Sequence, residues 1–203
     1  MSDHPSATLA DIPTPATATT PFVLRRCPPG IRLRLAAAAT GLTLLWTLVL
    51  LASTRITISH GLHHPVVALH LISLTAGFGG VLAVDVCTLS GLLRRHDFTL
   101  ADSIRAASAM DPLIWLGYFG LIFSGLLLRP DFDEPLMWVK LGAGFLAGLN
   151  GINAKGVMYS LGGLPQAVRL ADLPRSFAVR AVAAALLSQL AWWTAIFIGF
   201  FGI

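Results

Sequence analysis

Charged residues are scarce in this sequence: only 12% of its 203 residues are Asp, Glu, Lys or Arg, whereas 55% are hydrophobic. A soluble globular domain usually carries about twice that charged fraction. Cysteine is also rare, and the two cysteines, Cys27 and Cys87, lie far apart. The composition therefore argues against a soluble domain, and the cysteine spacing offers neither a CxxC motif nor a disulfide framework.

Several common functional motifs are missing as well. The sequence contains no Walker loop, no GxGxxG after a strand, no HExxH and no GxSxG. The net charge of +4 does not indicate nucleic acid as a partner, because the basic residues separate apolar segments and form no patch with interleaved aromatic residues. We interpret these basic residues as determinants of membrane topology.

What the chain does contain is a series of long apolar segments. A helix needs about 20 mostly apolar residues to cross a bilayer. We predict an all-α, polytopic membrane bundle with five spans at about 35–51, 66–93, 112–128, 136–161 and 181–203. Residues 1–33 are predicted to form a disordered cytosolic tail with a basic collar, and 34–203 the membrane domain. Asp111 is expected to cap the third helix, with Pro112 as its first residue.

The basic residues also predict an orientation. With the N-terminus in the cytosol, the outer side would hold only Arg55 and Arg129, with Lys140 just inside the membrane. The inner side would hold eleven basic residues, namely Arg25, Arg26, Arg32, Arg34, Arg94, Arg95, Arg105, Lys155, Arg169, Arg175 and Arg180. This excess on one side is the pattern of a plasma (inner) membrane protein with a cytosolic N-terminus. We expect the lipid bilayer as its environment. The sequence is compatible with a homo-oligomer or with a membrane partner and does not choose between them.

The second span carries a histidine and an aspartate. His70 and Asp85 lie within a helical face that also contains Ser73, Gly77 and Thr88. Ionisable residues in a spanning helix are costly and usually face the interior of the bundle. We therefore take this face as the candidate functional site, between the second and fourth helices.

An outer cluster of nitrogen ligands is expected at one end of the spans, formed by His60, His63, His64, His70 and Lys140. The four histidines are candidate metal ligands because neutral imidazole binds copper, zinc and haem iron. Alternatively, the first three are solvated residues of a loop, and His70 forms a hydrogen bond between helices. Lys140 either joins His70 in binding a cofactor or extends to the outer headgroups.

An inner polar cluster is expected at the other end, formed by Asp85, Asp111, Asn150, Asn153 and Lys155. Asp85 and Lys155 are candidates for a structural ion pair. The alternative is a relay for protons or ions that connects the two clusters.

Short motifs in residues 66–155 resemble known families. His70 followed by Gly77-Phe78-Gly79-Gly80 resembles a helix of the CopD-like copper-resistance membrane proteins and of the HemJ-type protoporphyrinogen oxidases. Asp111-Pro112, Gly117, Gly125 and Trp138-Val139-Lys140-Leu141 are similar to the order P…G…W-x-K-L in both families. Lys140-Leu141 followed by Leu149-Asn150-Gly151 resembles a family of integral membrane proteins without an assigned activity. A CopD-like protein would meet copper at the outer histidines, whereas in a HemJ-like protein His70 and Lys140 would lie near the haem or porphyrin.

Three functions follow from these patterns. The first is a membrane protein that handles a transition metal such as copper, or haem b, between the second and fourth helices. The second is an integral-membrane oxidoreductase of the protoporphyrinogen-oxidase type. The third is a scaffold subunit whose polar residues only join helices. No catalytic residue follows from the sequence.

Overall fold

The computed structural model describes residues 27–56, 58–93, 100–162 and 173–201. The elements are α1 (Pro29–Ser53), the 3₁₀ turn η1 (His60–Leu62), α2 (His63–Leu93), α3 (Leu100–Leu127), α4 (Pro135–Leu161) and α5 (Arg175–Phe201). Within the described residues the structure is therefore entirely helical, as predicted.

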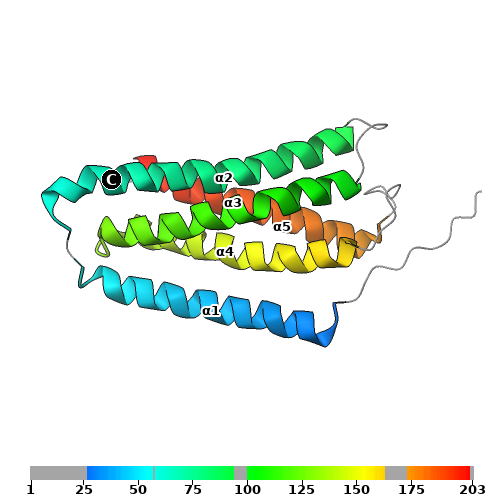
Figure 1. Cartoon of the computed structure of the whole chain (residues 1–203), viewed down its shortest axis with the longest axis horizontal. Coiled ribbons are helices and arrows are strands. Elements are labelled where there is room, and N and C mark those ends of the chain that lie inside the picture. Colours follow the sequence, from blue (N-terminus) through cyan, green and yellow to red (C-terminus); the bar gives the residue numbers. More distant parts are fainter. Residues whose placement is uncertain (1–26, 57, 94–99, 163–172, 202–203) are drawn as a thin grey trace, which may run out of the picture.

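The five long helices lie side by side and alternate in direction (Figure 1). One end of the bundle holds η1, the connection between α3 and α4, and the last turn of α5, and we call it the histidine end. The opposite end holds the first turns of α1, α3 and α5. Side chains near the start of α2, the start of α4 and the end of α5 are thereby brought to the same depth.

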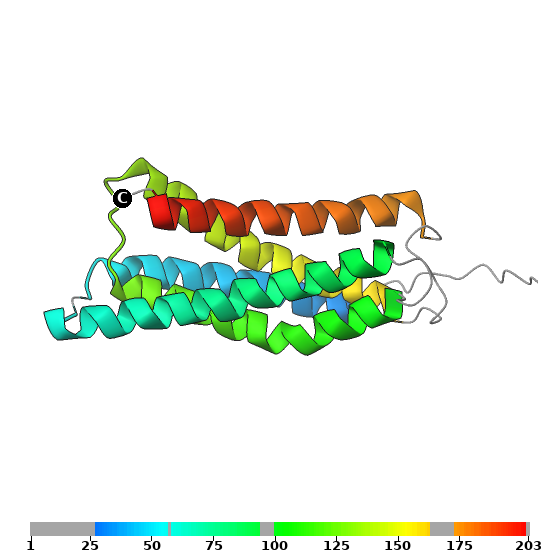
Figure 2. The same cartoon turned by 90° about the horizontal axis from the view of Figure 1, so that it is seen from above.

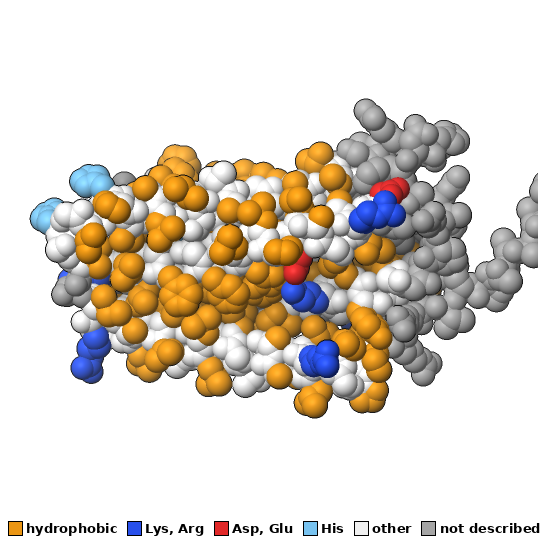
Figure 3. Space-filling view, viewed as in Figure 1, with side chains coloured by type: hydrophobic (Ala, Val, Ile, Leu, Met, Phe, Trp, Pro, Cys, Tyr) orange, Lys and Arg blue, Asp and Glu red, His pale blue; other side chains and the backbone are white. Residues whose placement is uncertain are grey.

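Within the residues that the structure describes, four helical segments are long and apolar enough to cross a membrane: Pro29–Ser53, His60–Cys87, Asp102–Leu127 and Arg175–Phe201. Hydrophobic side chains cover much of the surface along the bundle (Figure 3). The predicted fourth span coincides with α4, which is not among these four because Lys140, Asn150, Asn153 and Lys155 make it more polar. The structure confirms an all-α, multipass membrane bundle.

The start of α3 differs from the prediction. The helix begins at Leu100, and Pro112 lies inside it, so the expected cap at Asp111 and the expected start at Pro112 are wrong. A proline inside a helix removes one backbone donor and bends the axis. Figure 2 shows α3 bent in this way. Membrane helices tolerate such a proline because neighbouring helices support the interrupted backbone.

Small residues bring α2 and α3 into close contact. A Cβ atom added at Gly117 would collide with the backbone of Gly77 and the carbonyl oxygen of Ser73. One added at Gly120 would overlap the side chain of Ser73. Without these glycines the two backbones could not approach so closely, which is the usual role of small residues between membrane helices.

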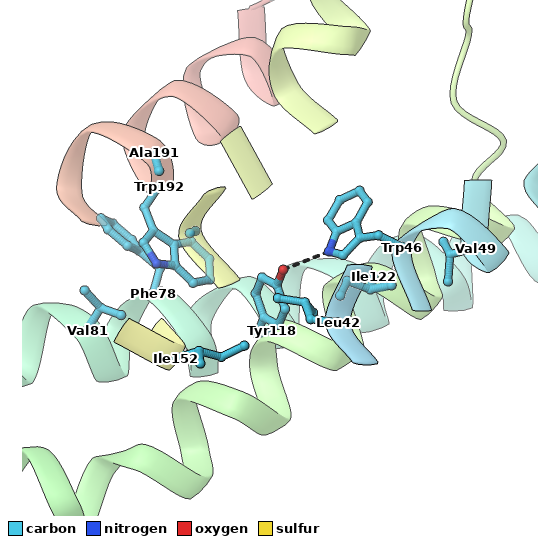
Figure 4. Packing of buried hydrophobic residues seen from close by; sticks show 11 residues of the cluster. Leu42, Trp46, Val49, Phe78, Val81, Tyr118, Ile122, Ile152, Ala191 and Trp192 are labelled. Atoms are coloured by element: carbon cyan, nitrogen blue, oxygen red, sulfur yellow. Dashed lines mark hydrogen bonds between the residues drawn. The ribbon is translucent and has the colours of Figure 1, made fainter. Parts of the chain in front are cut away.

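Aromatic residues form the centre of the core. The indole Nε1 of Trp46 donates to the Tyr118 hydroxyl at 2.9 Å, and that hydroxyl donates to the Gly144 carbonyl at 3.0 Å. The first of these bonds is drawn in Figure 4. Phe78 packs against Trp192 with ring centroids 5.7 Å apart. These contacts join α1, α3 and α4 on one side and α2 with α5 on the other.

Candidate ligand cavity at the histidine end

A cavity of about 440 Å³ opens in the half of the bundle nearest the histidine end. All five helices contribute to its walls, which are mainly aliphatic and aromatic. This volume lies within the range of small-molecule and cofactor sites, roughly 300–1,000 Å³. The strongly polar side chains among its described lining residues are His70, Lys140 and Arg129, together with the hydroxyls of Ser53 and Tyr118. No described Asp or Glu lines it.

His70 is held by a fully buried serine. Its Nδ1 lies 2.9 Å from the Ser124 hydroxyl oxygen, and Ser124 has no exposed surface. That hydroxyl lies 2.5 Å from the Gly120 carbonyl, to which it donates its only proton. The Ser124 oxygen must then accept from Nδ1–H, so we assign neutral His70 the tautomer with its lone pair on Nε2. Nε2 has no hydrogen-bond partner among the described residues. It is accessible from the cavity, because no buried side-chain nitrogen or oxygen of these residues lacks a partner.

Lys140, which belongs to α4, lines the same cavity as His70. Its ammonium group makes no hydrogen bond or ion pair with any described residue. A Cβ atom added at Gly199 would lie 3.3 Å from Nζ, so the glycine of α5 leaves room for the lysine. The cavity therefore holds an unpaired, half-buried cation, a placement that is costly unless something satisfies it.

Arg129 lies at the outer edge of the same cavity, just after α3. It is exposed, and its φ of 52° makes it the one described non-glycine residue with a positive φ. Glycine is favoured at this position after a helix, and an L-residue in the left-handed region costs roughly 1–2 kcal/mol. Arg129 makes no ion pair with a described carboxylate.

The other predicted outer ligands do not join His70. His60, His63 and His64 are exposed at the start of α2, where the rings of His63 and His64 lie 5.9 Å apart. None of the three lines the cavity. Across the part of the chain that the structure describes, no three His, Cys, Asp or Glu side chains come together in a way that could hold a metal ion.

The predicted inner cluster divides into separate pairs. Lys155 forms an ion pair with Asp111 at 2.9 Å and lies 5.3 Å from the ring centre of Trp115. The expected pair of Asp85 with Lys155 is therefore wrong. Instead, Asp85 accepts a hydrogen bond from the Gln189 amide of α5.

The two asparagines of this cluster also lie apart. Asn150 is buried and donates to the Ala184 carbonyl at 2.7 Å, which ties α4 to α5. Asn153 is exposed. Within the described residues these contacts join helices and form no continuous polar path toward His70.

Three residues that shape these sites were not identified from the sequence. The sequence places Arg129 on the outer side as a basic residue and assigns no role in a site to Ser124 or Gln189. Gln189 carried a usable signal, because an amide in the middle of an apolar span needs a polar partner. The roles of Ser124 and Arg129 depend on which side of α3 faces the cavity, which the spacing alone did not reveal.

Comparisons of the chain with protein-family models, with curated proteins and with solved structures find no match.

Proposed function

We propose that this multipass membrane protein binds a tetrapyrrole of the haem b type in the cavity, with Nε2 of His70 as the ligand of its iron. The observation that carries the proposal is the arrangement of His70. Its Nδ1 is tied to buried Ser124, and its Nε2 is left without a partner in an apolar cavity. A metal-binding histidine commonly uses its second nitrogen in such an orienting hydrogen bond.

The donor set favours haem over a bare copper or zinc ion. A bare ion of this kind needs about three or four protein ligands, and the described residues offer no such group. Haem iron is already held by the porphyrin and needs only one or two axial ligands from the protein. One imidazole in an apolar cavity of 440 Å³ supplies this requirement. The resemblance to HemJ-type proteins points the same way and assigns His70 and Lys140 to the cofactor.

If haem binds, it supplies one-electron chemistry, while the chain's own residues position it. Ser124 fixes the orientation of the His70 ring, and the apolar walls exclude water. The oxidoreductase of the protoporphyrinogen-oxidase type is the enzymatic form of this proposal, with a porphyrinogen or quinone as substrate. The predicted location is the plasma (inner) membrane with the N-terminus in the cytosol.

The test is a haem titration of protein purified in mild detergent, followed in the Soret region. We expect one haem per chain in the wild type and loss of the bound spectrum in His70→Ala. His63→Ala is the matched control, since His63 belongs to the same helix but does not line the cavity. Equal haem binding by wild type and His70→Ala, with both folded by circular dichroism, would contradict the proposal. The CopD-like alternative would be favoured if the protein binds no haem but binds copper tightly through His60, His63 or His64. The scaffold would be favoured if it binds neither haem nor copper.

A further inference from the structure

The charge in the cavity is of one sign. Lys140 and Arg129 both line it, and the nearest other polar groups, those of His70, Ser53 and Tyr118, carry no fixed negative charge. The acidic residues nearest in sequence are Asp131, Asp133 and Glu134, which follow Arg129 in the connection to α4. None of these three lines the cavity, and Asp131 instead accepts from the backbone N–H of Asp133 at 3.0 Å.

The two cations lie toward one side of this cavity. Lys140 belongs to the second turn of α4, and Arg129 follows the last turn of α3, so both lie near the histidine end. Deeper walls are provided by Trp46, Ala147 and Trp192, which are all buried and apolar in character. The cavity is therefore amphipathic, with positive charge toward the histidine end and apolar walls farther from that end.

We propose that Lys140 and Arg129 form an anion clamp at the histidine end of the cavity. It takes an amphiphilic ligand whose apolar body fills the cavity and whose carboxylate or other anionic group points to the histidine end. Lys140 is the inner member of the clamp, unpaired and half-buried, and Arg129 is the exposed outer member. The choice of a tetrapyrrole as this ligand rests on the proposed function. If the ligand is haem b, the clamp would hold its propionate groups.

Two further features support a binding role over a structural one. Gly199 keeps the space beside Nζ of Lys140 open, so the amine is accessible to a ligand. Arg129 occupies a left-handed backbone conformation in which glycine would be favoured. A charged side chain is thus present at the cavity edge despite a conformational cost.

The test compares the binding of a fluorescent fatty acid, cis-parinaric acid, with the binding of its methyl ester. Because neither probe is a haem, the test still gives a result if the protein does not bind haem. Energy transfer from tryptophan reports binding, because Trp46 and Trp192 line the cavity. In Gly125→Phe the new side chain would begin 3.6 Å from the His70 ring and fill part of the cavity. The energy transfer that this variant loses is therefore the part that reports binding in the cavity. We expect the wild type to bind the acid about tenfold more tightly than the ester, as one charge-assisted contact implies.

Variants of Lys140 and Arg129 test whether these two side chains cause the tighter binding of the acid. Lys140→Gln should abolish most of it and Lys140→Arg should retain it, whereas Arg129→Gln should reduce it about threefold because exposed charges interact weakly. Arg55→Gln is the matched control, since Arg55 is an exposed arginine after α1 that does not line the cavity. Equal binding of acid and ester by the folded wild type would overturn the clamp, as would an equal loss in Arg55→Gln and Arg129→Gln.

The source of the anion is then distinguished by competition. Displacement of the fatty acid by protoporphyrin IX, and not by its dimethyl ester, supports a tetrapyrrole held through its carboxylates. Displacement by phosphatidylglycerol and not by phosphatidylcholine, lost in Lys140→Gln, supports the clamp but assigns it to a lipid headgroup. That second result would contradict the proposed function while leaving the anion clamp in place.

Discussion

The imidazole Nδ1 of His70 and the hydroxyl of Ser124 lie 2.9 Å apart, between α2 and α3. Because Ser124 is fully buried and donates to the Gly120 carbonyl, this bond fixes both the tautomer and the direction of the histidine ring. The close contact of α2 and α3 at Gly77 and Gly117 brings the two side chains together. The geometry of the candidate site is thus a consequence of the helix packing.

Removing the serine hydroxyl should weaken the site without removing the ligand. We expect Ser124→Ala to lower haem affinity roughly tenfold, because loss of an orienting hydrogen bond to a metal ligand typically costs 10–100-fold. The measurement is the Soret titration of the purified variant. Thr75→Ala is the control, since Thr75 lies in α2, the helix of His70, and its hydroxyl bonds only to the Leu71 carbonyl. An unchanged affinity in Ser124→Ala would show that this bond does not orient the ligand.

The glycine contact between α2 and α3 should be intolerant of any side chain. We expect Gly117→Ala to destabilise the protein by about 1–3 kcal/mol, because overpacking forces the two backbones apart. Gly79→Ala is a matched control in α2, since nothing lies within 4 Å of a Cβ atom added there. The measurement is unfolding in mixed detergent micelles, followed by circular dichroism. Similar stability of the two variants would indicate that the helices are not in contact at Gly117.

The hydrogen bond from Trp46 to Tyr118 should be an important connection between α1 and the rest of the bundle. Tyr118→Phe leaves the indole N–H of Trp46 and the Gly144 carbonyl without this partner, and we expect a loss of about 1–3 kcal/mol. A double-mutant cycle with Trp46→Phe measures the interaction directly. If the two effects are simply additive, the two side chains do not interact and the position of α1 in the bundle is wrong.

The predicted orientation can be tested with single cysteines. In a background with Cys27→Ser and Cys87→Ser, we would introduce Ser59→Cys at the histidine end and Ser176→Cys at the opposite end, both at exposed positions. The excess of basic residues at the opposite end predicts that it lies in the cytosol. A membrane-impermeant maleimide should therefore label the Ser59→Cys variant, and not the Ser176→Cys variant, in intact spheroplasts. Labelling of position 176 alone would reverse the topology.

The helical architecture was largely predictable because span length and hydrophobicity are local properties of the sequence. The depth argument also placed His70 and Lys140 at the same level, and both line one cavity in the structure. Pro112 was misinterpreted as a helix start, because a proline inside a membrane helix and one at its first turn look alike in sequence. The helix bounds therefore depend on packing that the local pattern does not contain.

The partners of the polar residues were harder to predict. Asp85 bonds to Gln189 rather than to Lys155, and Lys155 pairs with Asp111. Depth along the membrane is compatible with several such pairs. The choice among them depends on the rotation of each helix about its own axis, which is set by small residues such as Gly77 and Gly117. A mixed face of polar and apolar residues does not specify that rotation.

The most direct test of the account is the iron–histidine stretching band in the resonance Raman spectrum of the reduced, haem-loaded protein. The band should be present in the wild type, absent in His70→Ala, and shifted to lower frequency in Ser124→Ala, because loss of a hydrogen bond from Nδ1–H makes the imidazole a weaker ligand. Retention of an unchanged band in folded His70→Ala would contradict the central claim that His70 is the ligand.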